Sequence, residues 1–157
     1  MSVSIQILAA IAVLTNAVVY GADTVAALVT RSVNRRLDDT CMTISAGWGH
    51  YYADSRMPPI GITGVVSALL AAVLAAVGGY TVAAVAAGLA VLALVVWLVL
   101  YARIAKPVNT AQKAAAQSGI IPPDARALQD RWESILYPRV GLQLVALIAL
   151  VVAVAAA

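Results

Sequence analysis

The chain has 157 residues, of which 63% are apolar and only 11% are charged. Soluble domains contain about 45–50% apolar and about 25% charged residues, and a soluble domain of this size cannot bury so much apolar surface. A soluble enzyme and a free-standing nucleic-acid-binding protein are therefore disfavoured, although the net charge is +3. The sequence predicts one integral membrane domain over residues 1–157, which contacts the lipid bilayer and no nucleic acid.

Four apolar stretches are long enough to cross a membrane as helices. Two of them lie in the charge-free run from Met57 to Ala102, which would measure about 69 Å as one helix and is therefore read as two spans. Gly78-Gly79 is the expected turn between them, because paired glycines permit a tight reversal. We predict an all-α, four-helix membrane bundle. Its spans are residues 5–28, 59–77, 81–103 and 140–157.

All ten lysines and arginines lie in or at the border of two polar segments, residues 29–58 and 104–139. These segments follow the first and third spans, so they lie on the same side of a four-span protein. Basic residues favour the cytoplasmic side of a membrane. The sequence therefore predicts a multi-pass protein of the plasma membrane, such as a bacterial inner membrane, with both termini outside.

The first polar segment has an apolar stripe at helical spacing. This pattern predicts a short amphipathic cytoplasmic helix that lies against the bundle end or the membrane interface. The stripe consists of Leu37, Cys41, Ile44, Trp48 and Tyr51.

Prolines divide the second polar segment into shorter pieces. Pro107 is expected to end or kink the third span, and Asn109 with Gln112 three residues later forms a possible capping box. The resulting helix should end near Gly119. A further helix follows Pro122-Pro123-Asp124, and Pro138 is expected to break it before the fourth span.

Three polar residues of the first span share one helix face, because Asn16, Tyr20 and Asp23 are spaced by four and three residues. An ionisable group in a span is costly, by roughly 3 kcal/mol on insertion scales, and normally faces a partner or a cavity. Asp23 is either part of an ion pair with an arginine near the interface or a substrate or proton site.

His50 is the only histidine, and Asp54 four residues later could orient it. It is either an interfacial histidine without a role or a general base, since its pKa normally lies near neutrality. The aromatic residues Trp48, Tyr51 and Trp132 form either an interfacial belt or the mouth of a pocket for a flat, lipophilic ligand. The sequence shows no metal-binding cluster and predicts no cofactor, although a haem bound through His50 stays open.

Several short motifs occur in a fixed order along the chain. Taken together, the sequence resembles the anthrone oxygenase-like family of small four-helix membrane proteins. The motifs are Gly21-Ala22-Asp23, Met57-Pro58-Pro59, Lys106-Pro107-Val108-Asn109 and a window from Trp132 to Arg139.

The resemblance implies oxygenation of an anthrone to an anthraquinone. An anthrone has an activated methylene, and removal of a proton gives an anion that reacts with dioxygen. This chemistry needs a base, a dry aromatic pocket and hydrogen-bond donors for the anion. His50 would be the base, and Asn109 and Arg139 would be the donors. Trp48 and Trp132 would be walls of the pocket.

Two other functions stay open. Members of the family often carry a histidine inside the Trp…Arg window, and this chain has none there. The second possible function is therefore that of a non-catalytic membrane subunit or scaffold. It would associate with a second copy or with another membrane protein through small-residue helix faces. Such faces include Ala71, Ala75 and Gly79. A third possibility is a carrier of protons or solutes that uses Asp23.

Overall fold

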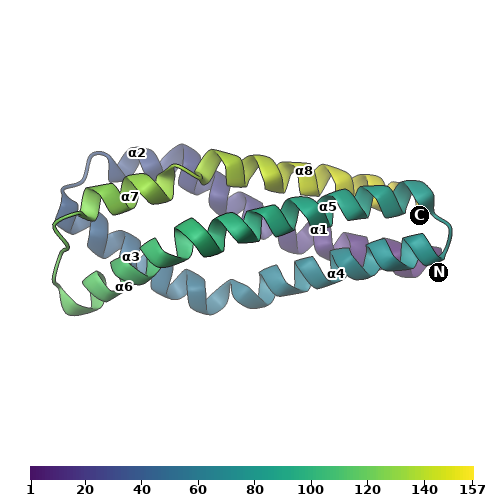
Figure 1. The fold of residues 1–157 in the computed structure, drawn as a ribbon, viewed down its shortest axis with the longest axis horizontal. Coiled ribbons are helices and arrows are strands. Elements are labelled where there is room, and N and C mark those ends of the chain that lie inside the picture. Colours follow the sequence, from purple (N-terminus) through teal and green to yellow (C-terminus); the bar gives the residue numbers. More distant parts are fainter.

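The computed structural model describes residues Met1–Ala157, and its regular elements are all helices. Four of these helices are long and apolar enough to cross a membrane, as in a small multi-pass membrane protein. Figure 1 shows them as an elongated bundle. In chain order the helices are α1 (Ser2–Val25), α2 (Arg31–Asn34), α3 (Asp39–Arg56), α4 (Pro58–Val77), α5 (Thr81–Leu100), α6 (Lys106–Ser118), α7 (Ala125–Glu133) and α8 (Leu136–Ala155).

The predicted four-helix bundle is confirmed. Helix α1 packs against α4 and α8, and α5 packs against the same two helices. The predicted turn between α4 and α5 is also confirmed. Gly79 has a φ of +77°, a left-handed conformation that glycine adopts without a steric penalty. This turn joins two antiparallel spans that would otherwise form one helix of excessive length.

Small side chains form the core of the bundle. Ala12, Ala68, Ala90 and Ala146 are fully buried where the four long helices meet. Large apolar residues such as Leu14 are exposed on the outside. Alanine lets helix backbones approach closely, and leucine and valine on the outer surface suit contact with lipid. The arrangement is therefore that expected of a bundle surrounded by acyl chains.

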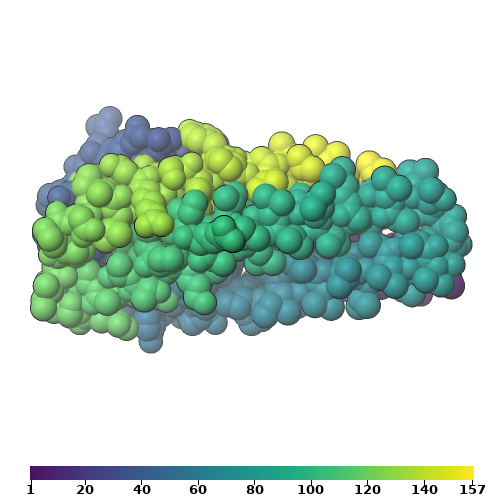
Figure 2. All heavy atoms as spheres, viewed as in Figure 1, coloured from purple at the N-terminus to yellow at the C-terminus, as the bar shows by residue number.

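Two of the long helices continue well beyond the length that a membrane requires. The continuous helices Ser2–Asn34 and Thr81–Ser118 contain 33 and 38 residues, which is about 50 and 57 Å at 1.5 Å per residue, against a hydrocarbon layer of about 30 Å. Their far ends gather with α3 and α7 at one end of the molecule. Figure 2 shows that this end is the broader one.

Of the two outcomes expected at Pro107, an end or a kink of the third span, the structure excludes the end. A π-helical turn, Tyr101–Ala105, links α5 to α6, and Pro107 lies in the first turn of α6. Proline lacks the N–H that an α-helix interior requires and clashes with an earlier carbonyl. A wider π-helical turn just before it relieves this conflict, so the helix continues to Ser118. Helix α6 then ends at Gly119 as predicted, with a φ of +73°.

Two other local predictions are wrong. The Asn109 side chain caps no helix, because Asn109 lies inside the continuous helix and donates to Asp54. Pro138 does not separate α7 from α8. Helix α7 begins after Asp124 as predicted and ends at Glu133, and Pro138 then lies in the first turn of α8, where its missing N–H costs no hydrogen bond.

Helix α3 buries a face that differs from its predicted apolar stripe. It buries Met42, Thr43 and Gly47, and a Cβ at Gly47 would collide with the Gln112 carbonyl of α6. By contrast, Trp48 of the stripe is 40% exposed. Cys41 and Tyr51 are also exposed, whereas Leu37 and Ile44 are half-buried, so only part of the stripe lies against the bundle end. The membrane interface stays a prediction for the rest.

Candidate functional site

A large cavity lies where α4 begins, between the four-helix bundle and the end formed by α3, α6 and α7. Its volume is about 540 Å³, within the range of roughly 300–1,000 Å³ that is common for ligand pockets. Most of its wall is apolar, including Val19 of α1, Ile62 of α4 and Leu98 of α5. A few polar side chains reach it from other helices.

One group of these polar side chains surrounds a buried ion pair. Arg139 of α8 donates through Nη2 to Asp23 Oδ1 of α1 at 2.7 Å. The other carboxylate oxygen, Oδ2, accepts from Trp97 Nε1 at 3.0 Å and from Gln143 Nε2 at 3.4 Å. Asp23 and Arg139 are only 5% and 6% exposed. The three donors satisfy a charge that would otherwise be costly to bury.

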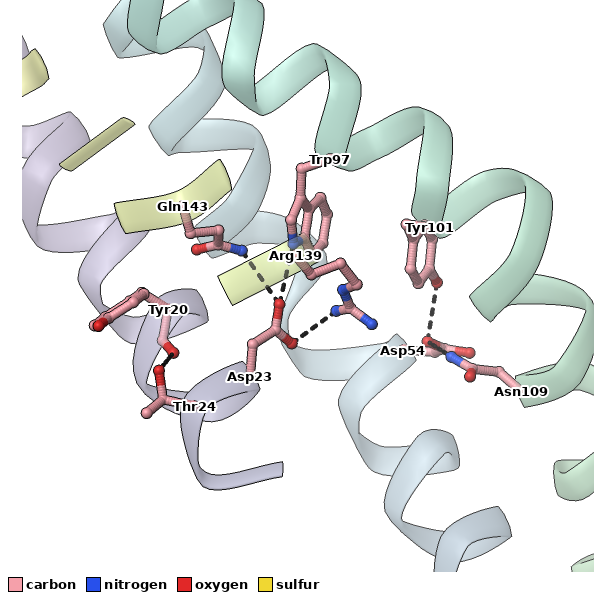
Figure 3. A network of polar contacts seen from close by, with 9 residues as sticks. All are labelled: Tyr20, Asp23, Thr24, Asp54, Trp97, Tyr101, Asn109, Arg139 and Gln143. Carbon is pink, nitrogen blue, oxygen red and sulfur yellow. Dashed lines mark hydrogen bonds and ion pairs between the residues drawn. The ribbon is translucent and has the colours of Figure 1, made fainter. Parts of the chain in front are cut away.

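The guanidinium of Arg139 keeps unused hydrogen-bonding capacity. Its Nη2 is paired with Asp23, whereas its Nε atom is buried without a partner. Figure 3 shows the remaining amino group pointing away from Asp23, toward the side where Asp54 lies. The ring centroids of Trp97 and Trp132 lie 4.7 and 5.8 Å from the guanidinium carbon, so two aromatic side chains hold it in position. The cavity is therefore lined by a fixed cation that is not fully hydrogen-bonded within the chain.

A second polar group surrounds Asp54 of α3. Lys113 Nζ lies 2.6 Å from Asp54 Oδ2, and Tyr101 and Asn109 donate to Asp54 Oδ1 at 3.0 and 3.2 Å. Burial raises the pKa of Asp54, but the hydrogen bonds from Lys113, Tyr101 and Asn109 and the charge of Lys113 outweigh it and hold the pKa below its usual value. Asp54 is thus a carboxylate at neutral pH. It fixes α3 to the helix formed by α5 and α6.

His50 lies one turn before Asp54 and lines the same cavity. Its ring centroid is 5.2 Å from that of Trp132. Burial lowers the pKa of His50 to about 4, although the negative charge of Asp54 and a contact with Gln112 act in the opposite direction. The imidazole is therefore neutral at physiological pH, and one ring nitrogen is free to accept a proton.

The structure brings together five of the nine residues selected from the sequence. The residues that line the cavity are Asp23, His50, Asn109, Trp132 and Arg139. Asn16 lies deeper in the bundle, where its side chain donates to the Gln143 carbonyl at 3.2 Å. Tyr20 points away from the ion pair (Figure 3). Trp48 and Tyr51 are exposed on the outer face of α3 and do not reach the cavity.

Sequence reasoning missed four residues that complete the site, namely Trp97, Tyr101, Lys113 and Gln143. Trp97 and Tyr101 are spaced by four residues and stack with their rings nearly parallel, at a centroid distance of 5.8 Å. Gln143 follows Arg139 by the same spacing. The spacing of four residues places the two aromatic residues on one face of the third span and the two polar residues on one face of the fourth. These two patterns could have indicated the site. The residues of the chain form no group of three or more histidines, cysteines and acids able to hold a metal ion.

The comparisons with known proteins give no match, because no family model, no curated protein and no solved structure matches the chain. The resemblance to anthrone oxygenase-like proteins is therefore carried by the short motifs alone. The findings identify a small all-helical protein with four long apolar helices able to cross a membrane.

Proposed function

We propose that this protein binds a lipophilic molecule with an oxygen-bearing head in the cavity at the start of α4. The observation that carries this proposal is the buried guanidinium of Arg139, which has free donors at the wall of a large and mainly apolar cavity. Buried donors without partners are costly, and an oxygen of the ligand would satisfy them. An apolar wall with a few placed polar groups is the usual composition of a ligand site.

A pair of alanines on α1 allows a direct test of this binding. Ala22 lines the cavity, whereas Ala17 is exposed on the same helix and lies outside it. We expect the purified wild-type protein and Ala17→Phe to release the same small molecule in an extracted-ligand mass spectrum. Ala22→Phe places a large side chain in the cavity. The variant should release at most about one tenth of the amount of small molecule that the wild type releases, which corresponds to binding weakened about tenfold. Equal amounts in both variants, or no bound molecule in any of them, would contradict the proposal.

The neutral His50 supports a second candidate function, oxygenation of an anthrone-type substrate without a cofactor. With a pKa of about 4, His50 is deprotonated throughout the physiological range, but it is a weak base. It therefore suits only an acidic C–H, such as the methylene of an anthrone. Arg139 and Asn109 line the same cavity and would stabilise the oxygen that carries the resulting charge.

In this reaction His50 takes one proton from the methylene, and the C–H electron pair delocalises toward the ring carbonyl. The carbanion reacts with dioxygen to form a peroxide, which the proton returned by His50 converts to a hydroperoxide. Loss of the second C–H proton with cleavage of the O–O bond gives the new carbonyl and one water. The substrate carbon is oxidised and one dioxygen is reduced.

Dioxygen uptake with anthrone as the substrate tests this chemistry. His50→Ala should lower the rate by at least about a hundredfold, the usual contribution of a positioned base. Ser55 is exposed on the same helix, so Ser55→Ala should leave the rate unchanged. Equal rates for wild type and His50→Ala would remove the proposed base but would leave the binding proposal standing.

The alternative function, a scaffold that associates through small-residue faces, has less support. Ala71 and Ala75 are fully buried inside the bundle of their own chain. Their small side chains serve the packing of α4 within the molecule, and of the three small residues only Gly79, at the turn, is exposed.

We also propose that the broad end with α3, α6 and α7 lies in the cytoplasm, because it holds nearly all of the basic residues. Cys41 of α3 is the only cysteine and is exposed. A membrane-impermeant maleimide should label it only after cells are permeabilised. A Cys41→Ser/Thr81→Cys double variant, with the thiol at the opposite end, should react in intact cells. The reverse pattern would invert the orientation.

A further inference from the structure

We propose that the ligand of the cavity is a single-chain amphiphile that enters from the lipid phase, between α4 and α5, and leaves its apolar chain in that opening. This inference rests on the proposed binding function. It adds the chemical class of the ligand and the side from which it arrives.

The wall of the cavity extends to the outer surface of the bundle. Ile62 of α4 and Leu98 of α5 both line the cavity, and they are 63% and 41% exposed. Both belong to helices able to cross the membrane, so their exposed faces would contact acyl chains and not water. Figure 2 shows α4 and α5 side by side along one face of the molecule. The cavity thus has a lateral opening toward lipid.

A smaller hollow continues the cavity toward the middle of the bundle. Its volume is about 50 Å³, and it shares four of its lining residues with the cavity. The shared residues are Val19, Gly61, Trp97 and Leu98. The remaining wall is mainly apolar, and its two polar side chains are engaged, because Thr15 and Asn16 both donate to backbone carbonyls. This hollow suits the methylene groups of one acyl chain and offers no unpaired polar side chain to a second polar head.

The polar part of the site therefore lies at one end and the apolar part at the other. Arg139 lines the cavity but not the smaller hollow, and the shared wall of Trp97 and Leu98 leads from the cavity to the apolar hollow. A molecule with a compact oxygen-bearing head and one flexible chain matches this order. A molecule that is polar at both ends would leave one end without hydrogen bonds in the hollow.

Gly61 is the residue that keeps the opening clear. It lines both hollows, and a Cβ at this position would meet no atom within 4 Å. A larger side chain can thus occupy the opening without moving the backbone. Gly88 of α5 provides a matched control, because a Cβ there also meets nothing within 4 Å and Gly88 lines neither hollow.

Tryptophan fluorescence in nanodiscs tests the route with two brominated probes. The protein carries Trp48→Phe, which removes the exposed tryptophan and leaves Trp97 and Trp132 beside the cavity. The first probe, 9,10-dibromostearate, has a carboxylate and one long chain. The second, 6-bromo-2-naphthoate, has a carboxylate head and no chain. Both quench tryptophan on contact.

We expect dibromostearate to quench the fluorescence with saturation. Gly61→Leu should weaken this binding by about tenfold or more, whereas Gly88→Leu should leave it unchanged. Binding of bromonaphthoate should be equal in all three proteins. If bromonaphthoate binds but Gly61→Leu leaves quenching by dibromostearate unchanged, the lateral route is wrong and the cavity keeps its function. If neither probe quenches with saturation, the binding proposal itself fails.

Discussion

The two halves of the bundle are stabilised by different interactions. Near the Gly78-Gly79 turn, buried apolar residues such as Ile5, Ala75 and Ala83 pack together. In the other half, the helices surround a cavity and are joined by ion pairs, including Asp23–Arg139 and Asp54–Lys113. Every ion pair of the structure lies in this second half.

This difference shows how a small membrane protein can keep a cavity open. Apolar side chains in the second half would collapse together or contact lipid, because dispersion forces favour close packing in any direction. Hydrogen bonds and ion pairs act only at defined distances and angles. Asp23 and Arg139 therefore hold α1 and α8 in position without filling the space beside them.

Removal of one charge in the cavity half should have the largest effect. Arg139→Met leaves Asp23 buried without its cation, and we expect a loss of about 3–5 kcal/mol in the free energy of unfolding. The Asp23→Asn/Arg139→Met double variant removes both charges and should recover most of this loss. Denaturant titration in mixed micelles measures both. Equal stability of the single and double variants would show that the pair does not hold this half together.

An increase in side-chain volume should have the second largest effect, and this effect should differ between the two halves. Ala90 is fully buried in the alanine core, so Ala90→Leu should cost about 1–3 kcal/mol by overpacking. Ala46 lines the cavity, and Ala46→Leu should change stability by less than about 0.5 kcal/mol because the space is already present. Thermal denaturation of the two variants in the same detergent makes the comparison. A similar loss of stability in both variants would contradict the proposed difference between the two halves.

A change in pH should affect only the cavity half, with the smallest effect. The pKa of His50 is about 4 in the folded protein against an ordinary value of 6.5. Between these values the unfolded chain binds a proton and the folded chain does not, so stability falls as the pH is lowered from about 6.5 to 4. His50→Gln should flatten this part of the profile of melting temperature against pH. An unchanged slope would assign the effect to another group.

Hydropathy and glycine placement were enough to predict the fold. The charge-free run from Met57 to Ala102 and the Gly78-Gly79 pair located α4, α5 and their turn, because lipid constrains the length and composition of a span. The continuation of the third helix through Pro107 was not predictable. It depends on a π-helical turn, Tyr101–Ala105, which no residue type specifies.

The candidate site was predictable only in part. Asp23, His50 and Arg139 stood out because ionisable groups are rare in this chain, and all three line one cavity. Lys113 was not connected with Asp54 because it lies beyond Pro107, where the third span was expected to end or kink. Tyr101 lies before Pro107, inside the predicted span, and was not selected because a single tyrosine near a span end is common. The unexpected continuation of the helix therefore concealed the contact between Lys113 and Asp54.

The π-helical turns have a geometric consequence for the cavity half. One turn, Ala26–Thr30, follows α1, and the other, Tyr101–Ala105, follows α5. A π-helical turn contains about one residue more than an α-helical turn, so all later side chains are rotated by about 100° around the helix axis. Deletion of a single residue from the second turn would restore the α-helical phase and direct Asn109 and Lys113 away from Asp54. One extra residue in the π-helical turn before α6 thus determines which face of α6 meets Asp54.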